Sequence, residues 1–323
     1  MKITHLVFFS CIAVLPIAAV HADTFGTGAN TFTIDFVPIG NPGNGDDRAF
    51  DATNHTPAIP NDDEYASPNG GVSYIYRMGA TEVAAEWVTK ARTLGLVGPH
   101  TPMIWTGLQP ATPMSWYQAA AFVNWLNTST GHQAAYNLTY ESLNFSMTPW
   151  SSAQAWQLGG ENLYRHKDAY YFLPSEDEWY KAAYHKNDGI TANYWDYATA
   201  SNFLPMAVVS GTAANTAVYN FVTDQAAAVN NDGGLSAYGT RGQGGNMWEW
   251  MEDEADGTND GSMFVRVVRG GAYDESGFYL SSAGRETAVG TQYSFRVASV
   301  IPEPSSALLL AAAGGTLLLR RRR

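Results

Sequence analysis

Apolar and polar positions alternate in one early segment of the chain. Phe32, Ile34 and Phe36 fall on one side of an extended backbone, with Thr33 and Asp35 on the other. This period of two predicts a half-buried β-strand. The surrounding stretch, from residue 23 to about residue 71, is rich in Gly, Pro, Asn and Asp, which predicts turns. No segment of about 20 to 50 residues repeats, so the sequence does not support a solenoid or a propeller.

A helical period is present in residues 81–91. Val83, Trp87 and Ala91 share one stripe there, with acidic residues early and Lys90 late. The helix dipole favours that order of charges, because its positive end is at the N-terminus. The segment therefore predicts an amphipathic helix.

Two further helices are predicted from capping boxes. Ser115 is followed three residues later by Gln118, and Ser175 is followed by Glu178 in the same way. In each pair the two side chains satisfy backbone N–H groups that the first helical turn leaves unpaired. Short strands and Gly- and Asn-rich loops separate the helices. The pattern predicts one α+β domain over residues 23–301, with much irregular structure.

The composition indicates a globular protein with an acidic surface. Hydrophobic residues make up 45% of the chain and charged residues 15%, which excludes a disordered chain and a multi-span membrane protein. Between residues 23 and 301 there are 29 acidic and 13 basic residues, a net charge of −16. Because such a surface repels phosphate backbones, we expect no nucleic-acid partner and favour cations or neutral ligands.

Residues 1–22 have the layout of a secretory signal peptide. Lys2 precedes an apolar stretch over residues 6–20, and small residues up to Ala22 fit a signal peptidase site. We expect signal peptidase to cut after Ala22. A buried N-terminal helix is the alternative. A lipoprotein anchor at Cys11 is disfavoured by the two phenylalanines before it, and this single cysteine excludes intramolecular disulfides.

Residues 302–323 contain three features in series. Pro302, Glu303 and Pro304 precede an uncharged run over residues 307–319, and four arginines follow. That run reaches about 20 Å as a helix, short of the roughly 30 Å hydrocarbon core. The order resembles the PEP-CTERM sorting signal of Gram-negative bacteria. The resemblance implies transient anchoring in the inner membrane, cutting by an exosortase, and delivery to the cell surface or extracellular polysaccharide.

The segment from Tyr171 to Ala183 carries a second resemblance. It reads Tyr-Phe-Leu-Pro-Ser-Glu-Asp-Glu-Trp-Tyr-Lys-Ala-Ala and is similar to the Arg-Leu-Pro-Thr-Glu-Ala-Glu-Trp-Glu-Tyr-Ala-Ala segment of the formylglycine-generating enzyme, or sulfatase-modifying factor, family. Further segments agree with the family in type and order: Pro113 to Leu126, Gly244 to Trp250, Arg269 to Tyr273, and Ser294 to Ala298. Together these motifs imply the family's C-type-lectin-related α+β fold, rich in irregular loops.

The copper chemistry of that family is not expected in this chain. The resemblance implies two copper-binding cysteines shortly after the Arg-Gly-Gly piece, but the stretch from Tyr273 to Leu280 offers Asp274 and Glu275 and no sulfur. Carboxylates do not replace thiolates as ligands for copper(I). The seven histidines also lack the His-x-x-x-His spacing of an iron site. We expect no copper, and no catalytic residue is identified.

The family resemblance implies a structural calcium site. Backbone carbonyls of Gly245 and Met247 and the side chain of Glu249 would be its ligands. The family's Asn or Asp three residues before Gly245 falls on Gly242 here, which removes one ligand. Residues 256–261 also copy the first half of a calcium-binding loop but lack its final Glu. Solvated acidic turns are the alternative at both places.

Aromatic residues offer candidate contacts for a ligand. Tyr194, Trp195 and Tyr197 follow the third predicted helix, and their rings have an apolar face suited to sugars. Packing against the Gly-rich closing segment is the alternative for this run. Trp248 and Trp250 alternate about Glu249, which favours a strand whose large side chains lie in the core.

Two function classes remain open from the sequence. The first is an exported, non-catalytic binding or structural module that presents its loops to extracellular polysaccharide or to a surface protein. The second is an oxidative enzyme of the same superfamily that uses a site without cysteine. The sequence assembles no recognisable nucleophile, base and oxyanion site, and the missing cysteine pair favours the binding module.

Overall fold

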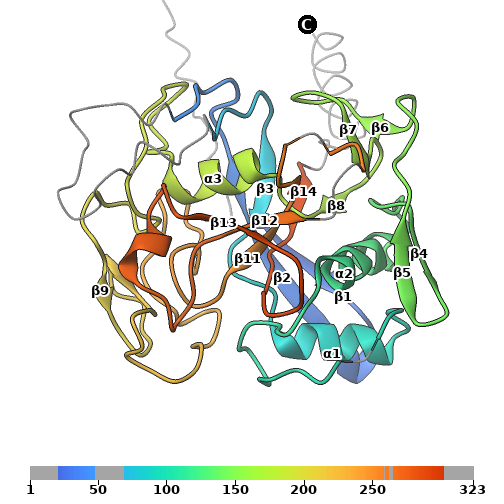
Figure 1. Ribbon diagram of the computed structural model, residues 1–323, viewed down its shortest axis with the longest axis horizontal. Coiled ribbons are helices and arrows are strands. Elements are labelled where there is room, and N and C mark those ends of the chain that lie inside the picture. The colour runs from blue at the N-terminus through green and yellow to red at the C-terminus, as the bar shows by residue number, and fades with distance from the viewer. Residues whose placement is uncertain (1–20, 48–68, 100, 258, 262–264, 302–323) are drawn as a thin grey trace, which may run out of the picture.

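An antiparallel sheet of five strands connects the beginning of the domain with its end (Figure 1). The computed structural model describes residues 21–47, 69–99, 101–257, 259–261 and 265–301. The last strand pairs with both of its neighbours in the sheet, which ties the end of the domain to its early segments. The sheet order is β1 (His21–Phe25), β2 (Phe32–Ile39), β3 (Tyr76–Gly79), β14 (Ala298–Val300) and β8 (Tyr171–Phe172).

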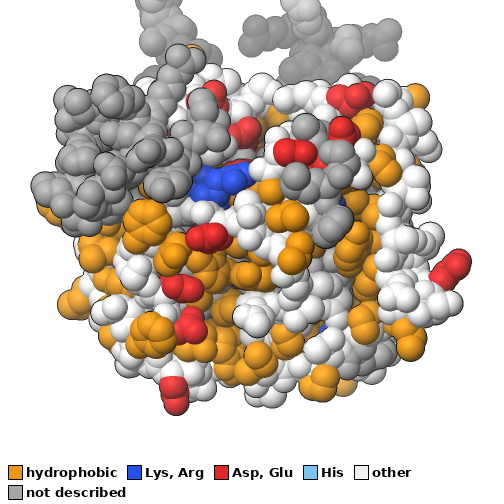
Figure 2. All heavy atoms as spheres, viewed as in Figure 1, with side chains coloured by type: hydrophobic (Ala, Val, Ile, Leu, Met, Phe, Trp, Pro, Cys, Tyr) orange, Lys and Arg blue, Asp and Glu red, His pale blue; other side chains and the backbone are white. Residues whose placement is uncertain are grey.

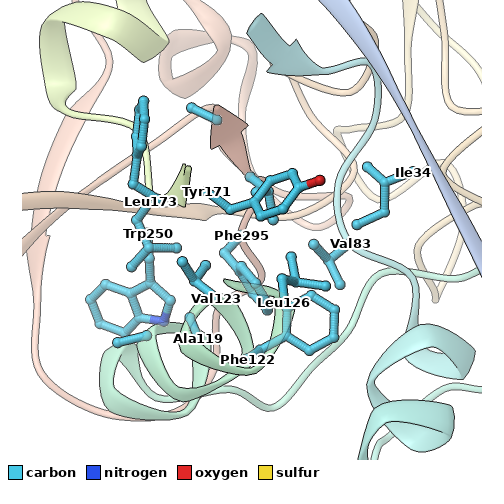
Figure 3. Close-up of a cluster of buried hydrophobic side chains, with 14 of the residues drawn as sticks. Ile34, Val83, Ala119, Phe122, Val123, Leu126, Tyr171, Leu173, Trp250 and Phe295 are labelled. Atoms are coloured by element: carbon cyan, nitrogen blue, oxygen red, sulfur yellow. The ribbon is translucent and has the colours of Figure 1, made fainter. Parts of the chain in front are cut away.

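The main core lies between this sheet and two helices, α1 (Ala85–Thr93) and α2 (Trp116–Ser129). Figure 3 shows Phe122, Val123 and Leu126 of α2 directed toward side chains of the sheet and of the closing segment. Phe122 meets Phe295 edge to face, with ring centroids 5.6 Å apart. Each such fully buried side chain contributes about 1.5–3 kcal/mol relative to exposure, so this cluster is the main source of stability.

A second helix–sheet unit carries the remaining motifs. The helix α3 (Glu176–Tyr184) lies apart from α1 and α2 and next to β11 (Figure 1). Trp179 of α3 packs with Met251 of β11 in a second buried cluster. The sheet consists of β11 (Glu249–Glu254), β12 (Arg266–Arg269) and β13 (Arg285–Ala288), all antiparallel.

Short pairs of strands and single turns make up the rest of the regular structure. The loops between them are long, as the Gly- and Asn-rich sequence predicts. These elements are η1 (Gly28–Asn30), β4 (Leu138–Glu141) with β5 (Asn144–Met147), β6 (Ala155–Trp156) with β7 (Asn162–His166), β9 (Met206–Ala207) with β10 (Thr216–Ala217), and η3 (Gly277–Leu280).

The predicted elements are largely confirmed. The early strand alternates buried and exposed residues from Phe32 to Phe36, and both capping boxes form with the reciprocal hydrogen bonds that the sequence predicts. The first helix begins at Ala85 rather than at residue 81. The preceding residues are extended, because the amide of Val83 donates to the carbonyl of Phe295. A tertiary contact thus replaces the first helical turn.

Trp248 and Trp250 lie in the core, as predicted, with 7% and 1% of their surfaces exposed. The expected alternation of buried and exposed residues along this strand is wrong, however. Nearly every residue of β11 is buried, on both faces of the strand. The indole of Trp250 donates to the carbonyl of Met114. The strand lies between α3 and the α2 side of the molecule, so neither face meets solvent.

The two terminal predictions fall mainly outside the described residues. Residues 1–20 and 302–323, with Pro302, Glu303 and Pro304, are among those not described. The expected cleavage position after Ala22 lies within β1, where His21 pairs with Phe36. Within the described parts of the chain, no helix has the length and apolarity needed to cross a membrane.

Candidate functional site

A pocket of about 170 Å³ opens between the β6–β7 hairpin and the N-terminus of α3. Tyr74 and Trp156 form its aromatic wall, with ring centroids 5.8 Å apart in an edge-to-face contact. Tyr74 is half-buried and Trp156 is buried. Carboxylates dominate its polar lining, so we call it the acidic pocket. Its charged lining residues are Glu161, Arg165, Asp177 and Asp253.

Arg165 forms the base of the acidic pocket and is fully buried between two glutamates. Its guanidinium contacts Glu178 with Nη2–Oε2 at 2.8 Å and Glu252 with Nη2–Oε2 at 2.7 Å. Its flat face lies 3.7 Å from the centroid of the Phe172 ring. A buried guanidinium needs such partners, because its charge is costly to remove from water. The three groups carry one net negative charge.

Hydroxyl and amide donors complete this buried network. Tyr74 donates to Glu178 at 2.6 Å, and Tyr136 donates to Glu252 at 2.9 Å. Asn162 donates to the other oxygen of Glu252 at 2.5 Å. Each added donor stabilises the charged form of the carboxylate that it reaches. Burial raises the pKa of the Glu178 carboxyl, but the charge and hydrogen bonds of Arg165, followed by the Tyr74 hydroxyl and the Ser175 amide, outweigh it and keep that pKa below its ordinary value.

Asp177 lies in the first turn of α3 and reaches into the acidic pocket. Its Oδ1 accepts the amide N–H of Gly70 at 2.8 Å. Its Oδ2 accepts no hydrogen bond from any described residue. Burial, opposed by the hydrogen bond from the Gly70 amide and helped by the charge of the neighbouring Asp46 carboxylate, raises the pKa of this carboxyl to about 6. The group therefore changes charge within the physiological range.

Asp253 lies beside it on β11. Its Oδ2 accepts the backbone N–H of Glu176, and its Oδ1 accepts the side-chain amide of Asn259 at 2.9 Å. Burial, followed by the charge of Glu252, raises the pKa of Asp253 to about 7. This carboxyl holds the start of α3 against the loop after β11, so both of its oxygens have structural partners.

The expected calcium ligand Glu249 has a different partner in the structure. Its carboxylate is fully buried and receives two bonds from Arg296, with Nε–Oε2 at 2.6 Å and Nη2–Oε1 at 2.5 Å. The Trp179 indole donates to Oε2 at 2.8 Å. A cation on Glu249 would therefore compete with a guanidinium that already balances its charge. Calcium at Gly245, Met247 and Glu249 stays a prediction.

A buried acid pair occupies the space beside Gly242. A Cβ at that position would meet Oδ2 of Asp232 at 2.4 Å and Oε2 of Glu82 at 3.2 Å. The amide of Asn246 donates to Glu82 Oε2 at 2.6 Å and lies 3.4 Å from Asp232 Oδ2. The carboxylate of Asp232 thus fills the place of the side chain that Gly242 lacks. Among the described residues, no group of three or more His, Cys, Asp and Glu side chains is arranged to hold a metal ion.

The aromatic run after α3 is mostly buried. Tyr194 is 4% exposed, and its hydroxyl lies between Asn44 and the carbonyl of Gly45. Tyr197 is 2% exposed and belongs to a small buried cluster. Neither ring offers a face to a ligand, which corrects the expectation from the sequence. Trp195 is half-buried, with the ammonium of Lys186 4.5 Å from its ring centroid.

The stretch from Tyr273 to Leu280 lies on another face. Its backbone is tied to a neighbouring loop, since the main-chain carbonyl of Glu275 accepts the amide of Asn220. Large hydrophobic side chains are exposed close to it, and Figure 2 shows hydrophobic side chains spread over this part of the surface near β9. The most exposed of them are Phe203 at 79%, Phe221 at 72% and Met206 at 64%.

Sequence reasoning did not identify the acidic pocket. Asp177 and Glu178 stood inside a capping box, where acidic residues are expected for the helix dipole alone. Arg165 and Glu252 are 87 residues apart in the chain, and neither belongs to a recognisable motif. The one available signal was the pair of additional acids, Glu176 and Asp177, in the Ser-Glu-Asp-Glu segment. The capping box uses only the first and last of these four residues.

Comparison with known proteins identifies the family. The model of the sulfatase-modifying factor enzyme 1-like domain matches residues 30–300, whereas comparison with curated proteins gives no match. Among solved structures, Treponema denticola variable protein 1 is 21% identical, with a TM-score of 0.56, over 87% of this chain and 99% of its own. CarF is 19% identical, with a TM-score of 0.51, over 83% and 98%. These two structures share the fold, and the family match spans most of the sequence. The chain therefore belongs to the sulfatase-modifying factor enzyme 1-like domain family.

Proposed function

We propose that the protein is a binding module that holds a sugar unit of an extracellular polysaccharide in the acidic pocket. The pocket itself is the observation that carries the proposal. It joins one half-buried ring, Tyr74, with carboxylates that accept hydrogen bonds from hydroxyl groups. Its volume of about 170 Å³ corresponds to roughly five to six water molecules at about 30 Å³ each, the scale of one sugar ring.

A non-catalytic role is part of the proposal. The stretch from Tyr273 to Leu280 contains no sulfur, so thiolate ligands for copper(I) are missing where the resemblance places them. Asp253 in the acidic pocket and Glu178 behind it also have structural partners. These bonds favour a preformed binding surface over a group that gains and loses protons during turnover.

Export is the other part of the proposal. The signal-peptide layout of residues 1–22 and the sorting signal over residues 302–323 both favour it. In this proposal the mature domain lies at the cell surface or outside a Gram-negative cell, after processing by signal peptidase and an exosortase. Calcium, if it binds, serves structure in this proposal.

The experiment measures binding to the host's own polysaccharide. Replacing a ring that contacts the ligand costs about 1–3 kcal/mol, so Tyr74→Ala should weaken binding by roughly 5- to 150-fold. Trp195→Ala is the matched control, since Trp195 is a half-buried aromatic residue outside the acidic pocket. If only Trp195→Ala weakened binding, the binding site would lie at the aromatic run instead of the acidic pocket. Absence of polysaccharide binding by the wild type would reject the proposal.

A surface protein is a second candidate partner, because Phe203, Met206 and Phe221 are exposed. Large apolar side chains that gather on one exposed surface are typical of protein contacts. Pull-down of envelope proteins by the wild type but not by Phe221→Asp, with Tyr74→Ala unaffected, would favour this partner over the polysaccharide.

A further inference from the structure

The acidic pocket carries a surplus of negative charge from the β6–β7 turn, from α3 and from β11. The β6–β7 turn contributes the exposed Glu161, and α3 contributes Asp177. Behind them, Arg165 is balanced by two glutamates and leaves one net negative charge. Asp253 of β11 adds a further carboxyl.

Among the residues that the structure describes, the basic groups near the acidic pocket have acidic partners. Arg269 and Arg285 contact Glu176, with Nη2–Oε1 at 2.7 Å and Nε–Oε1 at 2.9 Å. The guanidinium of Arg165 has no exposed surface. Asp46, which accepts the amide of Gly71 at the pocket edge, adds another acid. An anionic ligand would meet no free cation among these groups.

Two features favour an organic cation over a metal ion. Both oxygens of Asp253 accept hydrogen bonds from the protein. Asp177 also lines the pocket, and only its Oδ1 accepts a hydrogen bond from a described residue, which leaves Oδ2 for a ligand. A metal ion needs several such oxygens at once. A single ammonium group needs one carboxylate and a ring face, and the half-buried Tyr74 provides the ring.

We propose that the acidic pocket selects a sugar that bears a protonated amine, with Asp177 as the carboxylate that binds the ammonium group. This inference rests on the proposed function and specifies its ligand. Asp177 accepts the ammonium hydrogens at Oδ2 while Oδ1 stays on the Gly70 amide. Tyr74 packs against the sugar ring, and Glu161 attracts the cation at the mouth of the pocket.

The charge states define a window of pH for binding. Burial raises the pKa of Asp177 to about 6, so its carboxylate forms as the pH rises through that value. An α-amino group loses its proton at about pH 7.7–8.0, and a sugar amine of similar basicity follows it. Attraction between the two charges is therefore strongest at about pH 7, where most of each group is ionised. Tetramethylammonium keeps its charge at all pH values. For that probe, binding should therefore weaken only at low pH, where Asp177 is protonated, and not at high pH.

Calorimetric titration of the secreted domain tests this assignment. The probes are a fully deacetylated glucosamine tetramer and the matching N-acetylglucosamine tetramer, both at pH 7. We expect the amine form to bind at least tenfold more tightly, and Asp177→Asn to remove that preference. An Asn retains an oxygen for the Gly70 amide, so the variant should fold, which its melting curve checks. Asp274→Asn, a half-buried acid outside the acidic pocket, is the control and should leave both affinities unchanged.

The outcomes separate the two proposals. Equal binding of both tetramers, or an amine preference that survives Asp177→Asn, would overturn the amine assignment and leave the polysaccharide module standing. Failure of both tetramers and of the host polysaccharide would reject the binding module itself. Binding that rises above pH 8 would contradict the charge pairing, because a neutral amine gains nothing from Asp177.

Discussion

At the scale of single residues, buried charges determine the chemistry of this domain. Arg165 and Arg296 have almost no exposed surface, and each is paired with buried carboxylate groups: Arg165 with Glu178 and Glu252, and Arg296 with Glu249. Such pairs add little net stability over apolar side chains of the same shape, but the loss of one partner leaves the other charge unpaired. The Arg165 pairs therefore fix one wall of the acidic pocket and make it sensitive to substitution.

Arg165→Met should destabilise the domain by about 3–5 kcal/mol, because Glu178 and Glu252 would stay buried without their counter-charge. Urea unfolding measures the change. Lys90→Met is the control, since its pair with Glu86 is partly exposed at 3.4 Å and is worth only about 0.3–0.5 kcal/mol. Equal effects of the two substitutions would show that the buried network is not needed for folding.

The acid pair should make stability depend on pH. Burial raises the pKa of Asp232 to about 8, and burial together with the charge of Asp232 raises the pKa of Glu82. A carboxyl with a raised folded-state pKa stabilises fully below its unfolded pKa of about 3.9, and the contribution is lost as the pH rises toward 8. The groups facing the pair are Asn246, Arg241, Glu249 and Arg296.

Asp232→Asn should therefore melt at a higher temperature than the wild type at pH 8 and differ little at pH 4. Asn cannot ionise, so this variant removes the charge that the fold must otherwise bury. Melting curves from pH 4 to 9 measure the effect. An unchanged slope against pH in the variant would mean that another group controls the pH dependence.

At the scale of elements, helix starts and strand ends bring the polar groups together. The capping box of α3 places Glu178 against Arg165 and leaves Asp177 directed into the acidic pocket. The strand β11 then supplies Glu249, Glu252 and Asp253 to different partners. A helix N-terminus favours acids by its dipole, so the same turn serves both the fold and the pocket.

Calcium tests the role of the turn before β11. If an ion binds to Glu249 and the carbonyls of Gly245 and Met247, it should raise the melting temperature. A hundredfold excess over Kd corresponds to about 2.7 kcal/mol. Melting with calcium and with a chelator measures this, and Glu249→Ala should abolish the difference. Identical melting curves of the wild type with calcium and with chelator would show that the Glu249 carboxylate stays paired with Arg296.

At the scale of the whole molecule, the first and last parts of the domain meet in one sheet. The strand β14 pairs with β3 and β8, and β1 adds at the edge beside β2. Asp23 of β1 contacts Arg77 of β3 at 2.6 Å and accepts from Tyr171 of β8 at 2.9 Å. These contacts hold residue 23 to the body of the domain.

Processing should therefore leave a stable domain that begins near Asp23. Cutting after Ala22 removes two residues of β1 and retains the contacts of Asp23 with Arg77 and Tyr171. We also expect loss of the segment after about Pro304 in a host with the sorting machinery. N-terminal sequencing and intact mass of surface material measure both. A mature form in such a host that still carries the four terminal arginines would refute the sorting prediction.

The sequence by itself determined the elements that local rules control. Two capping boxes begin α2 and α3 because the Ser and the Gln or Glu three residues later are neighbours in the chain. The alternation from Phe32 to Phe36 fixed β2, and the ordered motifs fixed the family. These signals depend on residues a few positions apart, so periodicity and capping reveal them.

Tertiary structure alone decided which polar groups meet. Arg165 joins Glu178 and Glu252 from separate elements, and the side chain of Glu82, far from Gly242 in the chain, lies with Asp232 in the space beside that glycine. Tyr194 is a residue of a type suited to ligand contacts, yet its hydroxyl bonds with Asn44 and Gly45 hold it in the interior. Burial and pairing depend on the packing of segments distant in sequence, which no local pattern records. The acidic pocket therefore became visible only when the chain was folded.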